Sequence, residues 1–180
     1  TLPLAAHQVT ITISQLFYLI LFGMATAISI RISHFAGQND IEGIKANSKD
    51  GFRLVLFCSL LLSIPTLIFR NQLGALFSSN VEVQQIVGML IIVLIIYQFG
   101  DGMQYAFSNA LRGISCVQPL VPCAFIAYFL VSLPLGYVLG FIANLGILGI
   151  WLAFPFGLTL AGVLYWQRFR KELKKLEGRK

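Results

Sequence analysis

The stretch IVGMLIIVLIIYQFGDGMQYAFSN, residues 86–109, decides the fold, because it is long and apolar enough to cross a lipid bilayer as one α-helix. Asp101 is its one ionisable acid. A carboxylate at mid-bilayer costs on the order of 2.5–3.5 kcal/mol on insertion scales. We therefore expect Asp101 to face the interior of a helical bundle or a wet cavity, and not lipid.

The composition of the whole chain is that of an integral membrane protein. Of its 180 residues 57% are hydrophobic and 11% are charged, and the mean hydropathy is +0.81. About 25% charged residues would be usual in a soluble domain. The net charge of +6 does not indicate a nucleic-acid groove, because seven of the 13 Lys and Arg residues occupy the last thirteen positions.

The pattern of apolar runs predicts an all-α fold, a polytopic transmembrane helical bundle. The runs are long and do not alternate between apolar and polar residues, so strands of a membrane barrel are excluded. A pair of glycines, Gly136 and Gly140, predicts close contact between helices. Five spans are expected, at about 7–32, 52–69, 86–109, 120–142 and 147–167, followed by a basic tail over residues 170–180.

Basic residues predict how the spans are oriented. If the tail is cytoplasmic, alternation of the spans puts Arg31, Arg112 and the three basic residues between residues 45 and 53 inside, and only Arg70 outside. This leaves the N-terminus outside, directly ahead of an apolar run. We therefore expect at least one further span upstream, so that this chain is part of a longer polytopic protein.

A polar stripe surrounds Asp101 on its helix. At 100° per residue, four side chains lie within about 60° of it, whereas Phe99 and Met103 lie on the far side. Removal from water favours the protonated form of a carboxylate, and a nearby cation favours the ionised form. Asp101 could therefore exchange H⁺ for Na⁺, as in an ion-coupled transporter, or it could serve only as a hydrogen-bond partner for a neighbouring helix. The four stripe residues are Tyr97, Gln104, Tyr105 and Ser108.

The first span carries an uncharged stripe of Gln8, Thr12 and Gln15, which could line a cavity or form hydrogen bonds across helices. His7 is expected to be a hydrogen-bonded residue at the membrane interface. No HExxH, GxSxG or GxxxxGK[ST] motif is present. The sequence therefore predicts neither an enzyme nor a cofactor, and no metal apart from Na⁺ at Asp101.

Several segments resemble, in order, the C-terminal half of the multidrug and toxic compound extrusion (MATE) transporters, in their NorM-like branch. The match covers nearly all of residues 4–168. Its main segments are LAAHQVTITISQLFYLILFGMATAISIRISHFAGQND, YQFGDGMQYAFSNALRG, SLPLGYVLGF and GILGIWLAFPFGLTLAGVLYWQRF. One departure is ISCVQP after LRG, where the family has a short turn of another type.

The resemblance implies that residues 1–169 form part of one lobe of a twelve-helix transporter, corresponding to its eighth to twelfth helices. Such transporters lie in the plasma membrane, the inner membrane in bacteria, with cytoplasmic termini. They export cationic, often aromatic compounds in exchange for Na⁺ or H⁺. The resemblance assigns Asp101 and Tyr97 to the cation site. It also implies that this chain works with a seventh helix and an N-terminal lobe, and with membrane lipid.

Two other functions remain as alternatives. A lipid-linked saccharide flippase of the same superfamily would share the bundle, but it would be expected to carry basic residues within its spans, and the predicted spans have none away from their ends. A non-transporting membrane subunit would use Asp101 only to pair helices, and Asn would replace it without functional loss.

Overall fold

The computed structural model describes residues 2–178, and the chain is helical over almost all of this range. The helices along the chain are α1 (Leu2–Gly37), α2 (Ile41–Ile68), the short α3 (Arg70–Phe77), α4 (Val81–Gly113) and α7 (Gly146–Glu177). Between α4 and α7, four helical pieces follow one another without a break. They are α5 (Leu120–Phe125), η1 (Ile126–Ser132), α6 (Leu133–Tyr137) and η2 (Val138–Ile142), and are called the composite helix below. No strand occurs within residues 2–178, so the all-α prediction is confirmed.

Five helical segments are long and apolar enough to cross a membrane, and they correspond in order to the five predicted spans. Four of them contain their predicted span, whereas α2 ends at Ile68, one residue before the predicted end of the second span. Helices α2 and α4 begin before the predicted spans because polar caps start them early. Asp40 accepts a hydrogen bond from the Gly43 amide (2.9 Å) and starts α2 eleven residues before the predicted span at residue 52. Asn80 accepts from the amides of Glu82 (2.9 Å) and Val83 (3.3 Å) and starts α4.

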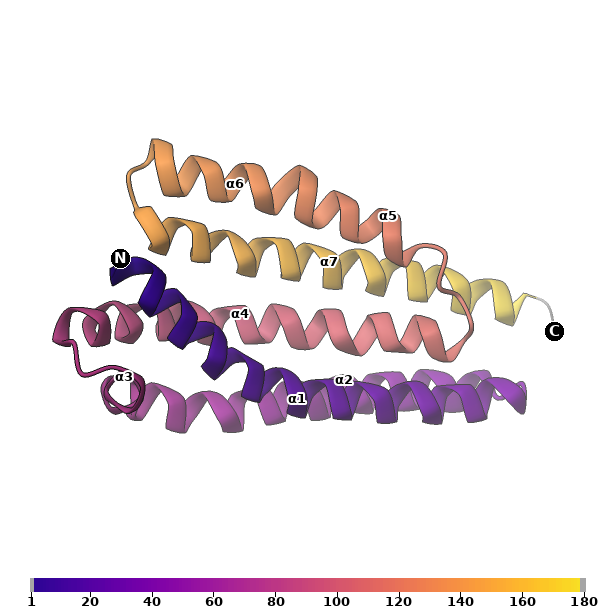
Figure 1. The fold of residues 1–180 in the computed structure, drawn as a ribbon. Helices are drawn as coiled ribbons and strands as arrows, with labels where there is room; N and C mark the ends of the chain where they lie inside the picture. Colours follow the sequence, from indigo (N-terminus) through magenta and orange to yellow (C-terminus); the bar gives the residue numbers. More distant parts are fainter. Residues whose placement is uncertain (1, 179–180) are drawn as a thin grey trace.

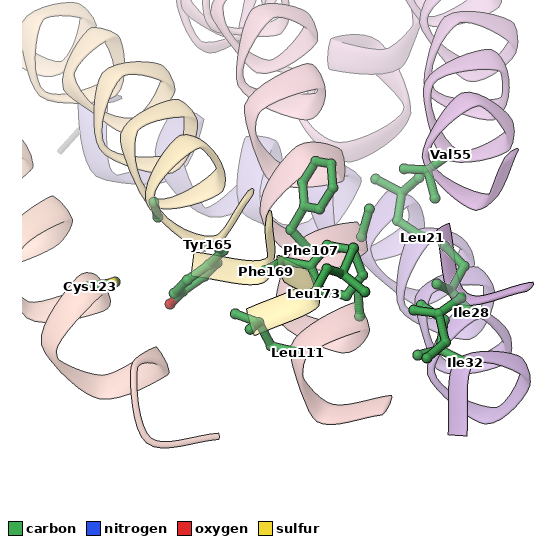
Figure 2. Close-up of a cluster of buried hydrophobic side chains, with 14 of the residues drawn as sticks. Leu21, Ile28, Ile32, Val55, Phe107, Leu111, Cys123, Tyr165, Phe169 and Leu173 are labelled. Atoms are coloured by element: carbon green, nitrogen blue, oxygen red, sulfur yellow. The ribbon is translucent and has the colours of Figure 1, made fainter. Parts of the chain in front are cut away.

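Helix α4 is the centre of the bundle. It packs against α1 and α2 on one side and against α7 on the other, and the composite helix covers α7 (Figure 1). Buried apolar side chains form two clusters. One joins α1, α2, α4 and α7 around Leu111, Phe107 and Phe169 (Figure 2). The other lies toward the N-terminus of α1, around Leu90, Leu94 and neighbouring residues of α1 and α7. Since α4 contributes to both clusters, it is shielded over most of its length.

The two ends of the bundle differ in charge. The α1–α2 turn, the α4–α5 connection and the C-terminus lie at one end, whereas the N-terminus, α3 and the α6–α7 connection lie at the other (Figure 1). Arg31, Lys45, Lys49 and Arg112 are therefore at the same end as the basic residues of α7 that follow residue 167. This charged end is the one assigned to the cytoplasm from sequence, and the side of the membrane stays a prediction.

Glycines bring α7 very close to the composite helix. A Cβ on Gly140 would come within 2.8 Å of the Ile150 side chain, whereas one on Gly136 would make an ordinary contact with Ala153 at 3.4 Å. The close contact predicted for this pair is therefore found at Gly140. A Cβ on Gly149 would fall on the carbonyl group of Leu139, and one on Gly157 would come within 2.6 Å of Ser132. Inside a bilayer no hydrophobic effect drives helices together, because lipid tails are as apolar as the side chains. Close backbone contact of this kind is then a main source of helix association.

Gly149→Ala is expected to destabilise the bundle by about 1–3 kcal/mol, because the new methyl group meets backbone, which cannot move aside alone. The measurement is the apparent melting temperature of the detergent-purified protein. It is the temperature at which half of the monodisperse size-exclusion peak is lost. Gly23→Ala is the matched control, since a Cβ there has nothing within 4 Å. Equal melting temperatures for the two variants would contradict this account of the α7 contact.

Candidate functional site

A cleft of about 780 Å³ lies between the first half of α1, α4, the composite helix and α7. Its walls are mostly apolar and aromatic, with the hydroxyl groups of Ser14 and Ser132 among the few polar groups. The aromatic lining residues come from every one of these segments: His7, Tyr97, Tyr128, Tyr137, Phe141, Trp151 and Phe154. An apolar cleft with a few convergent polar groups is the usual form of a small-molecule site.

Trp151 organises the aromatic wall. It is 2% exposed, and its indole Nε1 donates a hydrogen bond to Nδ1 of His7 at 3.2 Å, which links α7 to the start of α1. Its ring lies edge-on to Phe154 with a centroid separation of 5.6 Å. Tyr97 of α4 lies 6.4 Å from both rings. These separations suit aromatic pairing, so the wall is pre-formed.

Asp101 lies one helical turn beyond Tyr97 and is 4% exposed. None of the ion pairs formed within residues 2–178 includes it. The phenolic residues Tyr97 and Tyr105 lie one turn before it and one turn after it on the same face of α4. A buried carboxylate without a cationic partner is unfavourable unless it is protonated or binds a cation.

The two glycines beside Asp101 explain how the carboxylate is enclosed. A Cβ on Gly100 would come within 2.7 Å of Thr159 Oγ1 on α7. A Cβ on Gly102 would come within 2.9 Å of Val55 on α2. Because both neighbouring helices approach α4 closely on either side of this residue, Asp101 is buried within the bundle and is kept out of lipid. The expectation that it faces the bundle interior is therefore met.

The other residues of the predicted stripe have different environments. Gln104 is partly buried, and its Oε1 has no hydrogen-bond partner among the described residues. Tyr105 lies edge-on to Tyr18 of α1 with ring centroids 5.7 Å apart. Ser108 donates to the carbonyl group of Tyr105 at 3.2 Å and is satisfied within its own helix. The stripe thus offers an unpaired acceptor at Gln104 beside Asp101, but none at Ser108.

Gln98 is a polar residue that the sequence interpretation omitted. Its side chain is 1% exposed, and its Oε1 accepts a hydrogen bond from Ser63 Oγ of α2 at 2.9 Å. Its Nε2 and the nearby Ser59 Oγ have no partner within residues 2–178. The available signal was the helical wheel, on which Gln98 also lies about 60° from Asp101.

The predicted stripe on α1 does not line this cleft. Gln8 and Gln15 are exposed, and Thr12 donates to the carbonyl group of Gln8 at 2.9 Å. The residues that α1 contributes to the cleft are His7, Ile11 and Ser14. The cause is geometric, because the buried face of α1 is turned well away from that stripe. Gln8 and Gln15 therefore lie on the exposed side of α1, and Thr12 is half-buried.

Five apolar helices around a buried carboxylate define a multi-pass membrane protein. A model of the family described as MatE matches residues 1–138, and the chain belongs to this family. "Multidrug resistance protein NorM" of Aliivibrio fischeri is 38% identical over 164 residues, 89% of this chain and 36% of that protein. The NorM protein of Photobacterium profundum is 33% identical over 170 residues, 92% of this chain and 37% of that protein. The resemblance read from the sequence is thereby confirmed.

The chain spans little more than a third of the length of these relatives. Solved structures agree with this partial match. A eukaryotic MATE transporter, AtDTX14, superposes with a TM-score of 0.88 at 21% identity, over 99% of this chain and 41% of that one. A MATE protein in the bent conformation gives 0.87 at 15% identity, over 97% and 38%. At such identities the likeness supports the fold alone.

A double-mutant cycle on His7 and Trp151 tests the hydrogen bond that holds the cleft wall. His7→Phe removes the acceptor, Trp151→Phe removes the donor and the double variant removes both, while aromatic rings stay at both positions. We expect a coupling free energy of about 0.5–1.5 kcal/mol, the usual net contribution of one hydrogen bond. The readout is chemical unfolding in detergent, and strictly additive effects would exclude the bond.

Proposed function

We propose that this chain is the C-terminal lobe of a multidrug efflux transporter, which exports cationic amphipathic compounds in exchange for Na⁺ or H⁺. Asp101 is the coupling carboxylate in this proposal. The observation that carries it is the deep burial of Asp101 without a basic partner among the described residues, beside an aromatic cleft. A carboxylate with these surroundings is left to bind a cation or a proton from solution.

The residues around Asp101 suit the binding of a small cation. The phenolic oxygen of Tyr97 and the side-chain oxygen of Gln104 are on the same face of α4, one turn on either side of the carboxylate. Oxygen atoms are the ligands that hard cations prefer. Tyr97 also belongs to the cleft, so it connects the coupling site to the space where a substrate would bind.

The cleft suits amphipathic cationic substrates. Its aromatic faces, above all those of Trp151 and Tyr97, can attract a positive charge through cation–π contacts while the flat part of the substrate packs on apolar side chains. The walls of the described cleft include one titratable nitrogen group, that of His7, and no Lys or Arg. A cationic ligand would therefore meet little repulsion, whereas an anionic saccharide carrier would find no counter-charge.

Transport needs a second lobe, which we propose is the remainder of the length that the NorM relatives have and this chain lacks. Two lobes that rock around a central site expose it alternately to each side of the membrane. Occupation of the Asp101 site by a cation would stabilise one state, and substrate in the cleft the other. Couplings of this kind usually amount to about 1–3 kcal/mol.

The decisive experiment replaces Asp101 by Asn in the full-length protein that contains this chain, reconstituted in vesicles. Efflux of a fluorescent cationic dye is followed under an imposed Na⁺ gradient at constant pH, and separately under a pH gradient without Na⁺. Asp101→Asn keeps the shape of the side chain but removes its charge. We expect gradient-driven efflux to fall roughly 5- to 150-fold, the range that such coupling energies span.

Asp50→Asn is the matched control, because Asp50 also lies in a helix but is exposed and, among the described residues, pairs only with Arg53, one turn further along α2. It should leave efflux unchanged. The gradient that drives dye export by the unmodified protein identifies the coupling ion. Undiminished efflux by a correctly inserted Asp101→Asn protein would show that the aspartate is structural, as in a non-transporting subunit.

A further inference from the structure

A second hollow lies on the other face of α4, at the charged end of the bundle. It is a groove of about 640 Å³ between the first part of α2 and the last part of α7, and side chains of α4 form its floor. One of these is Met103, which lies roughly 160° around the helix from Asp101. The groove is therefore separated from the aromatic cleft by the body of α4.

The mouth of the groove is strongly basic. Lys45 and Lys49 reach it from α2, and Arg170 and Lys174 reach it from α7. The acidic residue among its described lining is Glu177, whose carboxylate forms an ion pair with Lys45. Four cations against one carboxylate leave three positive charges in excess.

The interior of the groove is apolar. Phe52 follows the two lysines on α2, and Trp166 precedes the two basic residues on α7. The remaining floor consists mainly of hydrophobic side chains, including Met103, Phe107 and Phe169. A positively charged mouth above a hydrophobic floor matches the chemistry of a molecule with an anionic head and an apolar chain.

The two walls have their charges at the same level. Helices α2 and α7 run in opposite directions, and the start of α2 lies beside the end of α7 (Figure 1). Along the axis of α2, Phe52 lies about 10 Å deeper in the bundle than Lys45. Along α7, Trp166 lies about 12 Å deeper than Lys174. Both walls therefore pass from charge to aromatic ring over the depth of a membrane interface, where Trp residues are typically found.

Two contacts hold the groove in shape. The ion pair between Lys45 and Glu177 ties the start of α2 to the end of α7. The Arg170 guanidinium lies over the Trp166 ring, 4.9 Å from its centroid, which orients the arginine at the junction of mouth and floor. Lys49 and Lys174 form no ion pair with any described residue, so their charges are not neutralised within residues 2–178.

We propose that this groove binds an anionic phospholipid, with the phosphate at Lys49, Arg170 and Lys174 and an acyl chain along the apolar floor. Charge selects the lipid class, because a zwitterionic lipid brings a positive group of its own to an already basic mouth. Basic pockets between transmembrane helices are recognised sites for anionic head groups. The site is independent of ion coupling at Asp101, and it fixes how α7 meets the membrane surface.

Native mass spectrometry of the full-length protein in mild detergent tests the proposal. The protein is titrated with phosphatidylglycerol and, separately, with phosphatidylcholine of the same acyl chains. We expect phosphatidylglycerol to bind at least about tenfold more tightly, given that each nearby basic residue favours an anionic lipid. The triple variant Lys49→Gln, Arg170→Gln and Lys174→Gln should lose this preference and keep its weak binding of phosphatidylcholine.

The matched control is the triple variant Arg31→Gln, Arg168→Gln and Lys171→Gln. It removes three charges from the same end of the bundle, but none of these residues lines the groove. It should retain the lipid preference. Equal losses of the preference in both triple variants would show that general surface charge causes it, and would overturn the proposal. An unmodified protein that binds both lipids equally would also overturn it, because the groove would then be inaccessible to lipid.

Two further variants keep the outcome interpretable. If the groove triple variant does not fold, the single variant Lys49→Gln, at an exposed position, should still weaken phosphatidylglycerol binding by about threefold, and an unchanged affinity counts against the site. Asp101→Asn should bind phosphatidylglycerol normally whatever its effect on efflux. Failure of the lipid site and failure of the transport proposal are thus distinguishable.

Discussion

The structure depends on the need to enclose α4. This helix carries the carboxylate of Asp101 into a region where neither water nor lipid head groups can solvate the charge. Other helices must therefore cover α4 wherever the carboxylate would otherwise meet lipid. Glycines at positions 100 and 102 let α7 and α2 come close on either side of Asp101. The central position of α4 in the bundle, and its share in both buried clusters, follow from this requirement.

Close packing and polar function are linked through the same residues. The glycine contacts between α7 and the composite helix hold Trp151 and Phe154 beside Tyr97, and so form the aromatic wall next to the carboxylate. A bundle held mainly by backbone proximity can keep such a cleft open without filling it with large side chains. The shape of the cleft therefore depends in part on small residues, such as Gly149 and Gly157, that are not among its lining residues.

The aromatic cleft and the groove between α2 and α7 differ in chemistry because they lie at different depths and on different faces of α4. The aromatic cleft has little charge, and the only acid near it is buried. The groove between α2 and α7 has its charges at the membrane surface, where Lys and Arg remain solvated, and its aromatic residues below them. One face of α4 is thus suited to a cation and the other to an anionic amphiphile.

Sequence alone determined the five spans, the burial of Asp101 and the family, because hydrophobic length, the cost of an intramembrane charge and ordered motifs are properties of the chain itself. The tertiary structure decided which polar residues face one another. The sector within about 60° of Asp101 includes Gln98 as well, but only the packing of the helices decided that its side chain accepts a hydrogen bond from Ser63 of α2. Gln8, Thr12 and Gln15 form a regular stripe, but the packing of α1 turns His7, Ile11 and Ser14 to the cleft instead. A helical wheel gives angles within one helix, whereas the direction of a neighbour is set only when helices pack.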